Sequence, residues 1–425
     1  MQEILFEYKL NPTTWAYISA LMMVGIYFKF QRFWSVRNLD LVGLIAFSPG
    51  LLLIYHGLLK QWPELIQSGY FCLFVVALFF LIRLLLDPLM VRRPLLDPNL
   101  SAGGLAFTCA SMLIFLMANV VTCPHERLEF ELAQHEAISS PEPGYAPFQV
   151  FSDITREKMA IDDQPYSDLS RRLTIHATTA HAAVILAHLA VVAGMVWIGF
   201  RHFNNLHTGV AAATLYLLTF YTSQLTSQLE HVAPAALLVW AIAVYRRPAI
   251  AGALIGFSAG LIYYPLFLLP LWCAFYWRRG VVRFALGTAA ALAAMVVLLF
   301  FCTTDFSSFS AQLGMMFGVR NPFTAPLSGF WQAHESVAVY RIPVVAAFVA
   351  LSIGLAIWPA HKNLGTLLSC TAAVMLATQF WHADHGGLCM CWFLPLLILT
   401  IFRPNLEDRI AISAVAPATG WRRMG

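Results

Sequence analysis

The stretch that decides the fold runs from Arg246 to Arg279 and reads RRPAIAGALIGFSAGLIYYPLFLLPLWCAFYWRR. Two arginines stand at each end, and no residue between them is charged. Because basic residues collect in the cytoplasmic loops of membrane proteins, both ends should lie on the cytoplasmic side. Pro265 disfavours a helical conformation for the residue before it, so a first helix should end near Tyr263 and Tyr264. The stretch therefore predicts a hairpin of two short helices with the tyrosines at its tip; one tilted helix with a proline kink is the alternative.

Three glycines in the first half of this stretch are spaced for close helix packing. Gly252, Gly256 and Gly260 are four residues apart, which places them on one face of a helix. Small residues at this spacing allow the backbone of a second helix to approach closely. The first arm of the hairpin should therefore have a tightly packed neighbour.

The composition assigns the whole chain to the membrane. Hydrophobic residues make up 59% of the 425 residues and charged residues only 11%, against about 25% charged in soluble proteins. The formal net charge of +4 matches the usual excess of Lys and Arg in cytoplasmic loops, and predicts no nucleic-acid partner. Most of the eight cysteines lie in apolar segments, and Cys389-Met-Cys391 lacks the paired spacing of a zinc site.

Apolar segments follow one another along most of the chain and predict an all-α polytopic membrane protein with about 13 transmembrane helices. The N-terminus should lie outside and the C-terminus in the cytoplasm. Every Lys/Arg cluster except Arg171-Arg172 and Arg341 then falls on the cytoplasmic side. The predicted spans are 14–30, 39–59, 70–86, 104–122, 173–200, 208–221, 232–245, the two arms of the hairpin, 284–302, 342–358, 367–380 and 388–402.

The longest polar stretch, residues 123–172, should form a large extracytoplasmic loop. It is rich in carboxylates, and a loop of this length in a compact protein is usually functional or disordered. Asp153, Asp162 and Asp163 are candidates for a general base that takes a proton from an acceptor hydroxyl. Solvated surface charge is the alternative for each of them.

Two further polar groups are predicted on the outer side. Glu230-His231 begins a span and could act as an acid/base or phosphate-contacting pair, or merely cap the helix. His382, Asp384 and His385 lie in a short loop near the end of the chain. They could contact a substrate, bind a divalent metal, or form a plain turn.

Two histidines on the span after the acidic loop share one helical face. His181 and His188 are seven residues apart, and His188 should lie inside the membrane. A hydrogen bond to a neighbouring helix is the expected role. A proton relay of the kind found in transporters is the alternative.

The middle of the chain resembles a known enzyme family. The segments Phe220-Tyr-Thr-Ser-Gln, Glu230-His231-Val-Ala-Pro and Ala251-Gly252-Ala-Leu-Ile-Gly256, with the hairpin that follows, are similar to GT-C glycosyltransferases, above all to mannosyltransferase-like and lipid-A-sugar-transferase-like members. These integral-membrane enzymes take a sugar from a polyprenyl-phosphate donor. Many relatives have a lysine where this hairpin carries tyrosines, and their catalytic acid usually follows the first core helix sooner.

The resemblance implies a division of the chain and a location. It covers about residues 104–402, so a GT-C-like membrane core would be preceded by an added three-span segment and followed by a cytoplasmic tail. The family suggests the bacterial inner (plasma) membrane and a cell-envelope role. The corresponding ranges are 1–100, 101–403 with the outer loop, and 404–425.

The implied function is hexosyl transfer from a polyprenyl-phosphate donor to an acceptor on the extracytoplasmic face. One of the three loop aspartates would be the base, the reaction needs no cofactor, and the partners are the donor and membrane lipid. A transporter or flippase of a lipid-linked or small anionic substrate, using His181, His188 and Asn119, is the alternative, as is a non-catalytic scaffold. Residues expected to bind substrate are Glu230, His231, Tyr263, Tyr264, Arg320, His382, Asp384 and His385.

Overall fold

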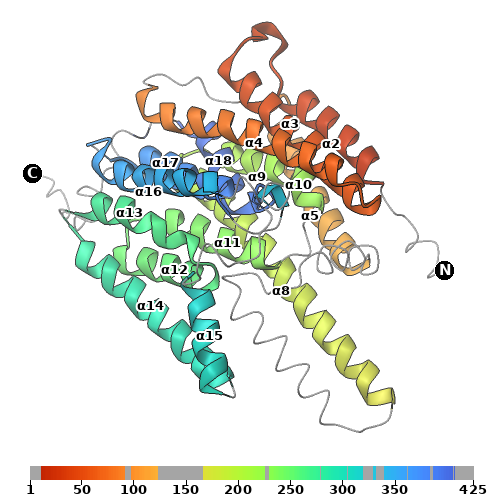
Figure 1. Cartoon of the computed structure of the whole chain (residues 1–425). Coiled ribbons are helices and arrows are strands. Elements are labelled where there is room, and N and C mark those ends of the chain that lie inside the picture. Colours follow the sequence, from red (N-terminus) through yellow and green to blue (C-terminus); the bar gives the residue numbers. More distant parts are fainter. Residues whose placement is uncertain are drawn as a thin grey trace, which may run out of the picture.

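The structure is a computed structural model of the chain (Figure 1), and every regular element in its described residues is a helix. It describes residues 11–90, 97–122, 166–224, 229–277, 279–303, 305–318, 329–331, 339–360, 362–382, 386–404 and 406.

The helices follow the apolar segments of the sequence. Their bounds are α2 (Pro12–Tyr27), η1 (Phe30–Arg32), α3 (Val36–Leu59), α4 (Pro63–Leu86), η2 (Asp87–Leu89), α5 (Ala102–Thr122), α8 (Tyr166–Arg201), α9 (Leu206–Leu218), α10 (Phe220–Gln224), α11 (Leu229–Ala243), α12 (Pro248–Leu261), η3 (Tyr264–Leu268), α13 (Leu269–Tyr276), α14 (Val281–Cys302), α15 (Phe306–Met316), α16 (Arg341–Ile357), α17 (Leu364–Ala377), η5 (Thr378–Phe380), η6 (Met390–Trp392) and α18 (Leu394–Phe402).

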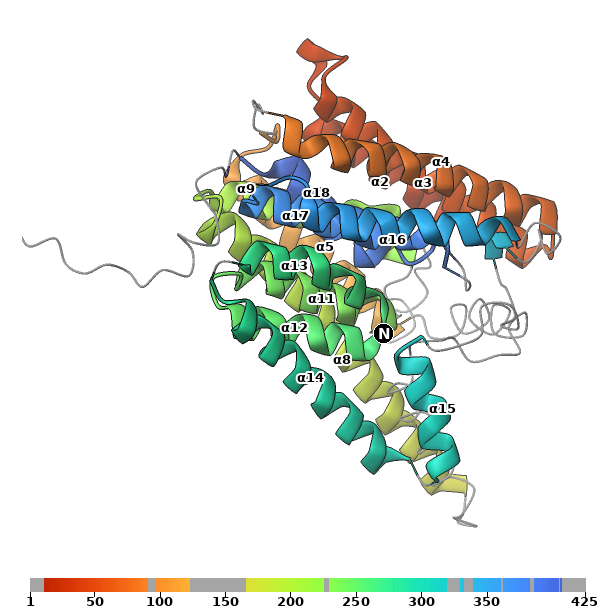
Figure 2. The same cartoon turned by 60° about the vertical axis from the view of Figure 1, so that its left-hand side comes forward.

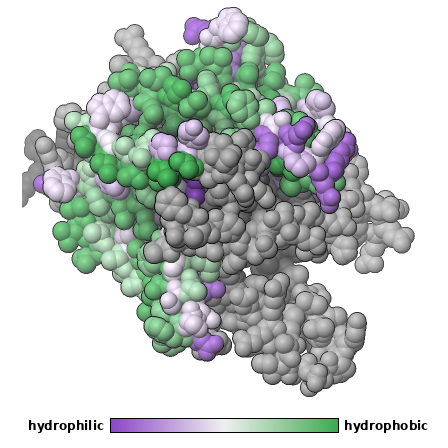
Figure 3. All heavy atoms as spheres, viewed as in Figure 1, coloured by the Kyte–Doolittle hydropathy of each residue, from purple (hydrophilic) through white to green (hydrophobic). Residues whose placement is uncertain are grey.

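The helices confirm the predicted class of a helical membrane protein. Each segment predicted to span the membrane contains a helix, and apolar side chains cover much of the surface seen in Figure 3. Five helices are long and apolar enough to cross a bilayer by length and composition, while several other apolar helices are shorter. The number of spans stays a prediction. The five are Val36–Leu59, Pro63–Leu89, Ala102–Val120, Ala182–Arg201 and Val281–Phe301.

The decisive stretch forms the predicted hairpin. α12 ends at Leu261, and after the break at Ile262 and Tyr263 the chain continues as η3 and α13. The two ends of the hairpin meet, because the Tyr276 hydroxyl donates a hydrogen bond to the Tyr245 carbonyl. Gly280, just beyond the second arm, packs against Pro248 at the start of the first. The single tilted helix is therefore wrong.

The glycine face of α12 packs against α14, as predicted. A Cβ atom on Gly256 would lie 2.6 Å from the Thr288 carbonyl oxygen, and one on Gly252 would clash with the Phe284 carbonyl. The Thr288 hydroxyl donates to the Gly252 carbonyl at 3.0 Å. Because no larger residue fits this seam, α12 and α14 lie backbone against backbone.

The helical bundle has two chemically different ends, which lie on opposite sides in Figure 2. We call one the arginine end; its turns join α2 to α3, α8 to α9, α11 to α12, α13 to α14, and α16 to α17. We call the other the tip end; it holds the hairpin tip and the turns that join α3 to α4, α14 to α15, and η5 to η6. Basic residues of the arginine-end turns include Lys29, Arg32, Arg201, Arg246, Arg247, Arg279 and Lys362.

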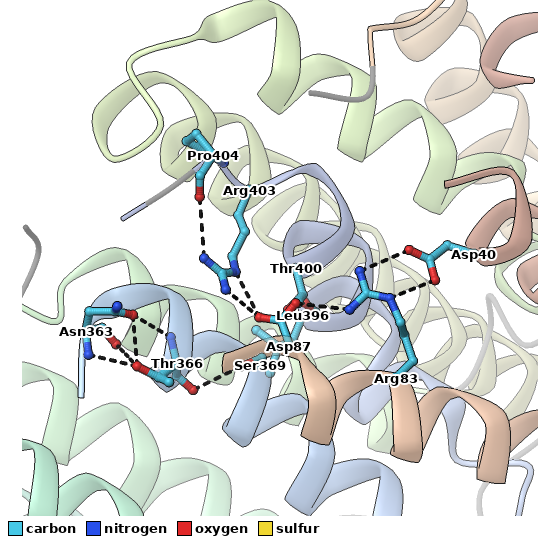
Figure 4. A network of polar contacts seen from close by, with 10 residues as sticks. All are labelled: Asp40, Arg83, Asp87, Asn363, Thr366, Ser369, Leu396, Thr400, Arg403 and Pro404. Atoms are coloured by element: carbon cyan, nitrogen blue, oxygen red, sulfur yellow. Dashed lines mark hydrogen bonds and ion pairs between the residues drawn. The ribbon is translucent and has the colours of Figure 1, made fainter. Parts of the chain in front are cut away.

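Buried ion pairs tie the first helices to the last one at the arginine end (Figure 4). Nε of Arg83 on α4 lies 3.1 Å from Oδ1 of Asp40 on α3, and its Nη1 lies 3.2 Å from Oδ1 of Asp87. Nε of Arg403, which follows α18, donates to Oδ2 of Asp87 at 3.1 Å. α4 also packs against α17, so the amino-terminal helices are joined closely to the rest of the bundle.

Candidate functional site

The hairpin tip lies at the centre of an aromatic cluster. The Tyr263 hydroxyl donates to the Tyr264 hydroxyl at 2.9 Å, and Tyr264 is only 1% exposed. The Tyr264 ring stacks on His382 with centroids 4.7 Å apart, and its centroid lies 5.1 Å from Trp392 and 5.4 Å from Trp381. Side chains distant in sequence thus surround one tyrosine.

His231 joins this cluster from the first turns of α11. Its ring centroid lies 6.3 Å from that of Trp392. Its Nδ1 is 3.1 Å from the Tyr221 hydroxyl, and its Nε2 is 3.9 Å from Cys389 Sγ. A neutral imidazole can accept at one nitrogen and donate at the other, so these contacts fix the ring orientation. We call His231, Tyr263, Tyr264, Trp381, His382 and Trp392 the tip cluster.

The turn that carries Trp381 and His382 is held by a buried glutamine. Oε1 of Gln379 accepts hydrogen bonds from the backbone N–H groups of Gly387 at 3.0 Å and Cys389 at 3.2 Å. Gly387 has a φ of +99°, a conformation that residues with a side chain rarely adopt. These features fix the start and the end of the loop and set His382 against the hairpin tip.

An arginine lies beside the cluster. Nε of Arg341, the first residue of α16, donates to the Trp381 carbonyl at 2.7 Å. No carboxylate among the described residues forms an ion pair with it. Arg341 is one of the two exceptions to the predicted charge distribution, the other being Arg171-Arg172, and it brings a positive charge to the tip end.

Two buried indole groups of the cluster have unused hydrogen-bond capacity. Within the described ranges, Nε1 of Trp381 and Nε1 of Trp392 have no acceptor, although the residues are only 6% and 0% exposed. By contrast, Nε1 of the equally buried Trp272 donates to Thr371 Oγ1 at 3.2 Å. Because a buried donor without a partner is costly, the cluster is suited to a ligand rich in acceptor oxygens.

The structure brings together four residues that the sequence singled out separately: His231, Tyr263, Tyr264 and His382. The backbone of Glu230 lies in α11, but its side chain is outside the described residues. Among the described residues no group of three His, Cys, Asp or Glu side chains could hold a metal ion. The candidates that lie outside the described residues altogether are Asp153, Asp162, Asp163, Arg320, Asp384 and His385.

Sequence reasoning missed Tyr221, Arg341, Trp381 and Trp392 as site residues. For Arg341 a signal existed, because it was an exception to the charge rule. Trp381 follows the predicted span 367–380 and directly precedes His382, so its place in the sequence was also a signal. Trp392 lies in a predicted span, where tryptophans are common core residues, and nothing in the sequence separated it from Trp272.

A second buried polar chain lies deeper in the bundle. The Tyr216 hydroxyl is 3.3 Å from His188 Nδ1 and 3.5 Å from Cys391 Sγ, and His188 is 1% exposed. The predicted hydrogen bond from His188 to a neighbouring helix is thus confirmed. The side chain of His181 is outside the described residues.

Comparison with known proteins gives no relative. No protein-family profile, curated protein or solved structure matches the chain. The likeness to GT-C glycosyltransferases therefore rests on the residues quoted in the sequence analysis.

Proposed function

We propose that the protein is a hexosyltransferase that moves a sugar from a polyprenyl-phosphate donor to an acceptor hydroxyl at the tip end. The observation that supports this most is the convergence of Tyr264, His231 and His382 from separate segments. Aromatic faces with a few placed polar groups are typical of ligand sites. The residues 123–165, with their carboxylates, connect α5 to α8 and supply the acid that the described cluster lacks.

In the proposed reaction, one of Asp153, Asp162 and Asp163 takes the proton of the acceptor hydroxyl. The acceptor oxygen forms a bond to the anomeric carbon of the sugar, and the bond from that carbon to the phosphate oxygen breaks. Polyprenyl phosphate leaves with the bonding electrons. Donors at the cluster stabilise the anionic leaving group, since charge-assisted hydrogen bonds are stronger than neutral ones.

The remaining assigned residues would act in binding. Tyr263 and Tyr264 would line the sugar site beside His231 and His382. The other residues assigned to donor or acceptor contacts are Glu230, Arg320, Asp384 and His385.

The proposed orientation follows from the basic residues of the arginine end. Positive residues favour the cytoplasmic side, so the tip end would face outward across a bacterial inner membrane. The N-terminus would be outside and the C-terminus inside, with about 13 spans and the GT-C-like core at residues 101–403.

The test is sugar transfer by the purified protein in lipid nanodiscs. Polyprenyl-phosphate donors with different radiolabelled hexoses are supplied with a membrane extract as acceptor. We expect label to reach an acceptor only with the wild type, and Asp153→Ala, Asp162→Ala or Asp163→Ala to abolish transfer without lowering the melting temperature. Full activity in all three variants would refute the proposed base.

Transport of a lipid-linked or small anionic substrate is the second candidate, and the buried chain of His188, Tyr216 and Cys391 favours it. Ionisable groups inside a membrane protein often line a substrate or proton pathway. Transport predicts that His188→Ala stops uptake of substrate by proteoliposomes, whereas transfer predicts that His188→Ala leaves the transfer rate close to that of the wild type.

A further inference from the structure

The turn between α2 and α3 is held in a fixed shape by two asparagines. Nδ2 of Asn38, which is almost fully buried, lies 3.0–3.1 Å from the carbonyl oxygens of Lys29, Arg32 and Phe33. Its Oδ1 accepts a hydrogen bond from the Lys29 N–H at 3.1 Å. Nδ2 of Asn99 donates to two carbonyl oxygens at the end of α2. These contacts make the turn a built part of the fold.

Three aromatic side chains of this turn are strongly exposed. The exposed fractions are 71% for Phe30, 59% for Phe33 and 83% for Trp34, the highest among the large apolar side chains of the described residues. The ring centroids of Phe33 and Trp34 lie 5.4 Å apart. Figures 1 and 2 both show the turn standing out from the bundle. Because amphipathic aromatic rings are enriched at the level of the lipid headgroups, the turn is suited to the membrane interface.

Two guanidinium groups lie close together on the same turn. Arg32 is exposed, whereas Arg37, in the first turn of α3, is partly buried. The positive charge of Arg32 and the negative charge of Asp97 both act on Arg37, but neither arginine forms an ion pair within the described residues. One Nη of Arg37 is also buried without a hydrogen-bond partner there. Two like charges and an unused buried donor favour an anion beside them.

Other cations of the arginine end already have partners inside the protein. Nζ of Lys362 donates to two backbone carbonyl groups at 2.8 and 2.9 Å, and Nζ of Lys29 donates to Oδ1 of Asn99 at 2.9 Å. Arg83 and Arg403 are paired with buried carboxylates. The two arginines of the α2–α3 turn differ from all of these in their available donors.

We propose that the α2–α3 turn binds the headgroup of an anionic phospholipid through Arg32 and Arg37, in the leaflet at the arginine end. A guanidinium pairs with two phosphate oxygens at once, and a negative headgroup offsets the repulsion between the two arginines. The exposed rings of Phe30, Phe33 and Trp34 supply apolar contacts to the lipid. The proposal needs only a membrane-embedded protein and does not rest on the proposed function.

The first experiment compares binding of phosphatidylglycerol and phosphatidylcholine, with the same acyl chains, to the whole protein by native mass spectrometry in detergent. The wild type should bind phosphatidylglycerol more tightly. The double variant Arg32→Gln with Arg37→Gln should lower that affinity at least about tenfold, and Arg32→Gln alone, at an exposed position, about fivefold. Affinity for phosphatidylcholine should not change.

The matched control removes two exposed cations from another turn of the same end. Arg246→Gln with Arg247→Gln makes the same change of charge between α11 and α12 and should leave binding of phosphatidylglycerol as in the wild type. An equal loss in the control would overturn the assignment to the α2–α3 turn. Wild-type affinity in the double variant of Arg32 and Arg37 would overturn the proposal altogether.

A second variant separates the rings from the charges. Phe33→Ala with Trp34→Ala keeps both arginines and should weaken binding of the two lipids by the same factor, so that the preference for phosphatidylglycerol is unchanged. Unchanged affinity for both lipids would overturn the role of the rings.

Competitors identify the class of ligand. Inorganic phosphate and poly-glutamate, each in large excess, should displace no phosphatidylglycerol from the wild type. Displacement by inorganic phosphate would assign the arginines to a free anion, and displacement by poly-glutamate would assign them to an acidic protein partner. Either result would overturn the lipid proposal.

Discussion

The two ends of the bundle differ in how their buried acidic and basic side chains are paired, although one Nη of Arg37 at the arginine end also has no described partner. At the arginine end, Arg83 and Arg403 are paired with Asp40 and Asp87, both of which are almost fully buried (Figure 4). At the tip end, three buried indole donors, those of Trp15, Trp381 and Trp392, have no acceptor within the described structure, and Arg341 has no described acid beside it. Paired charge fixes structure, whereas unused donors favour binding of a ligand.

The largest effect should come from breaking the ion pairs. Asp87→Ala leaves the buried guanidinium of Arg403 without its carboxylate and should destabilise the protein by about 3–5 kcal/mol. The measurement is the melting temperature in detergent. The double variant Asp87→Leu with Arg403→Met removes both charges and should be more stable than either single variant. If the losses of stability in the two single variants instead add up in the double variant, Asp87 and Arg403 do not stabilise the protein as a pair.

A smaller loss of stability is expected at the contact between α12 and α14, which holds the hairpin in place. Gly256→Ala would place a Cβ atom 2.6 Å from the Thr288 carbonyl oxygen and should cost about 1–3 kcal/mol through overpacking. Because the hairpin carries Tyr264, sugar transfer should fall as well. Gly354→Ala is the control, since nothing lies within 4 Å of its added Cβ; equal melting temperatures of the two variants would refute the close contact.

The difference between paired and unpaired donors can be measured directly. Trp272→Phe and Trp392→Phe remove the same atoms from two fully buried sites, but only Trp272 loses a hydrogen bond. Trp272→Phe should therefore be the more destabilising by about 1 kcal/mol. When donor lipid is bound, the difference in stability between Trp272→Phe and Trp392→Phe should become smaller or change sign. The reason is that Trp392→Phe would then also lose a hydrogen bond, the one from its indole N–H to the ligand. If the difference in stability between the two variants is the same with and without donor lipid, the indole N–H of Trp392 does not bind the ligand.

The smallest loss of stability is expected at the buried contacts between Tyr216, His188 and Cys391. Tyr216→Phe removes the hydroxyl next to His188 and Cys391 and should cost about 0.6 kcal/mol, as for an average hydrogen bond between membrane helices. Its rate of sugar transfer should equal that of the wild type. If Tyr216→Phe abolishes sugar transfer without changing the melting temperature, the functional site lies at His188, Tyr216 and Cys391 and not at the tip cluster.

The sequence predicted the positions of the helices because apolar segments and basic turns leave a strong local signal. The hairpin and its glycine face followed in the same way, from Pro265 and from glycines four residues apart. Boundaries were less accurate: α18 begins only at Leu394, and the residues before it form the turn and η6.

Contacts between segments that are distant in the sequence could not be predicted from it. Cys389 meets His231 across 158 positions, and Arg403 meets Asp87 across 316. Helices of similar apolar composition can pack in many arrangements, so no local pattern shows which of them are neighbours. The sequence therefore identified His231, Tyr264 and His382 as separate candidates but could not show that they form one cluster.

The pairing of Asp87 with Arg403 has a consequence for biosynthesis. A ribosome makes Asp40, Arg83 and Asp87 early, and at that stage one arginine faces two carboxylates. The second arginine emerges only 316 residues after Asp87. A chain that stops before Arg403 therefore leaves Asp40 and Asp87 to share Arg83 at the arginine end, and the ion pair that joins the end of α4 to the end of α18 forms only when translation is nearly complete.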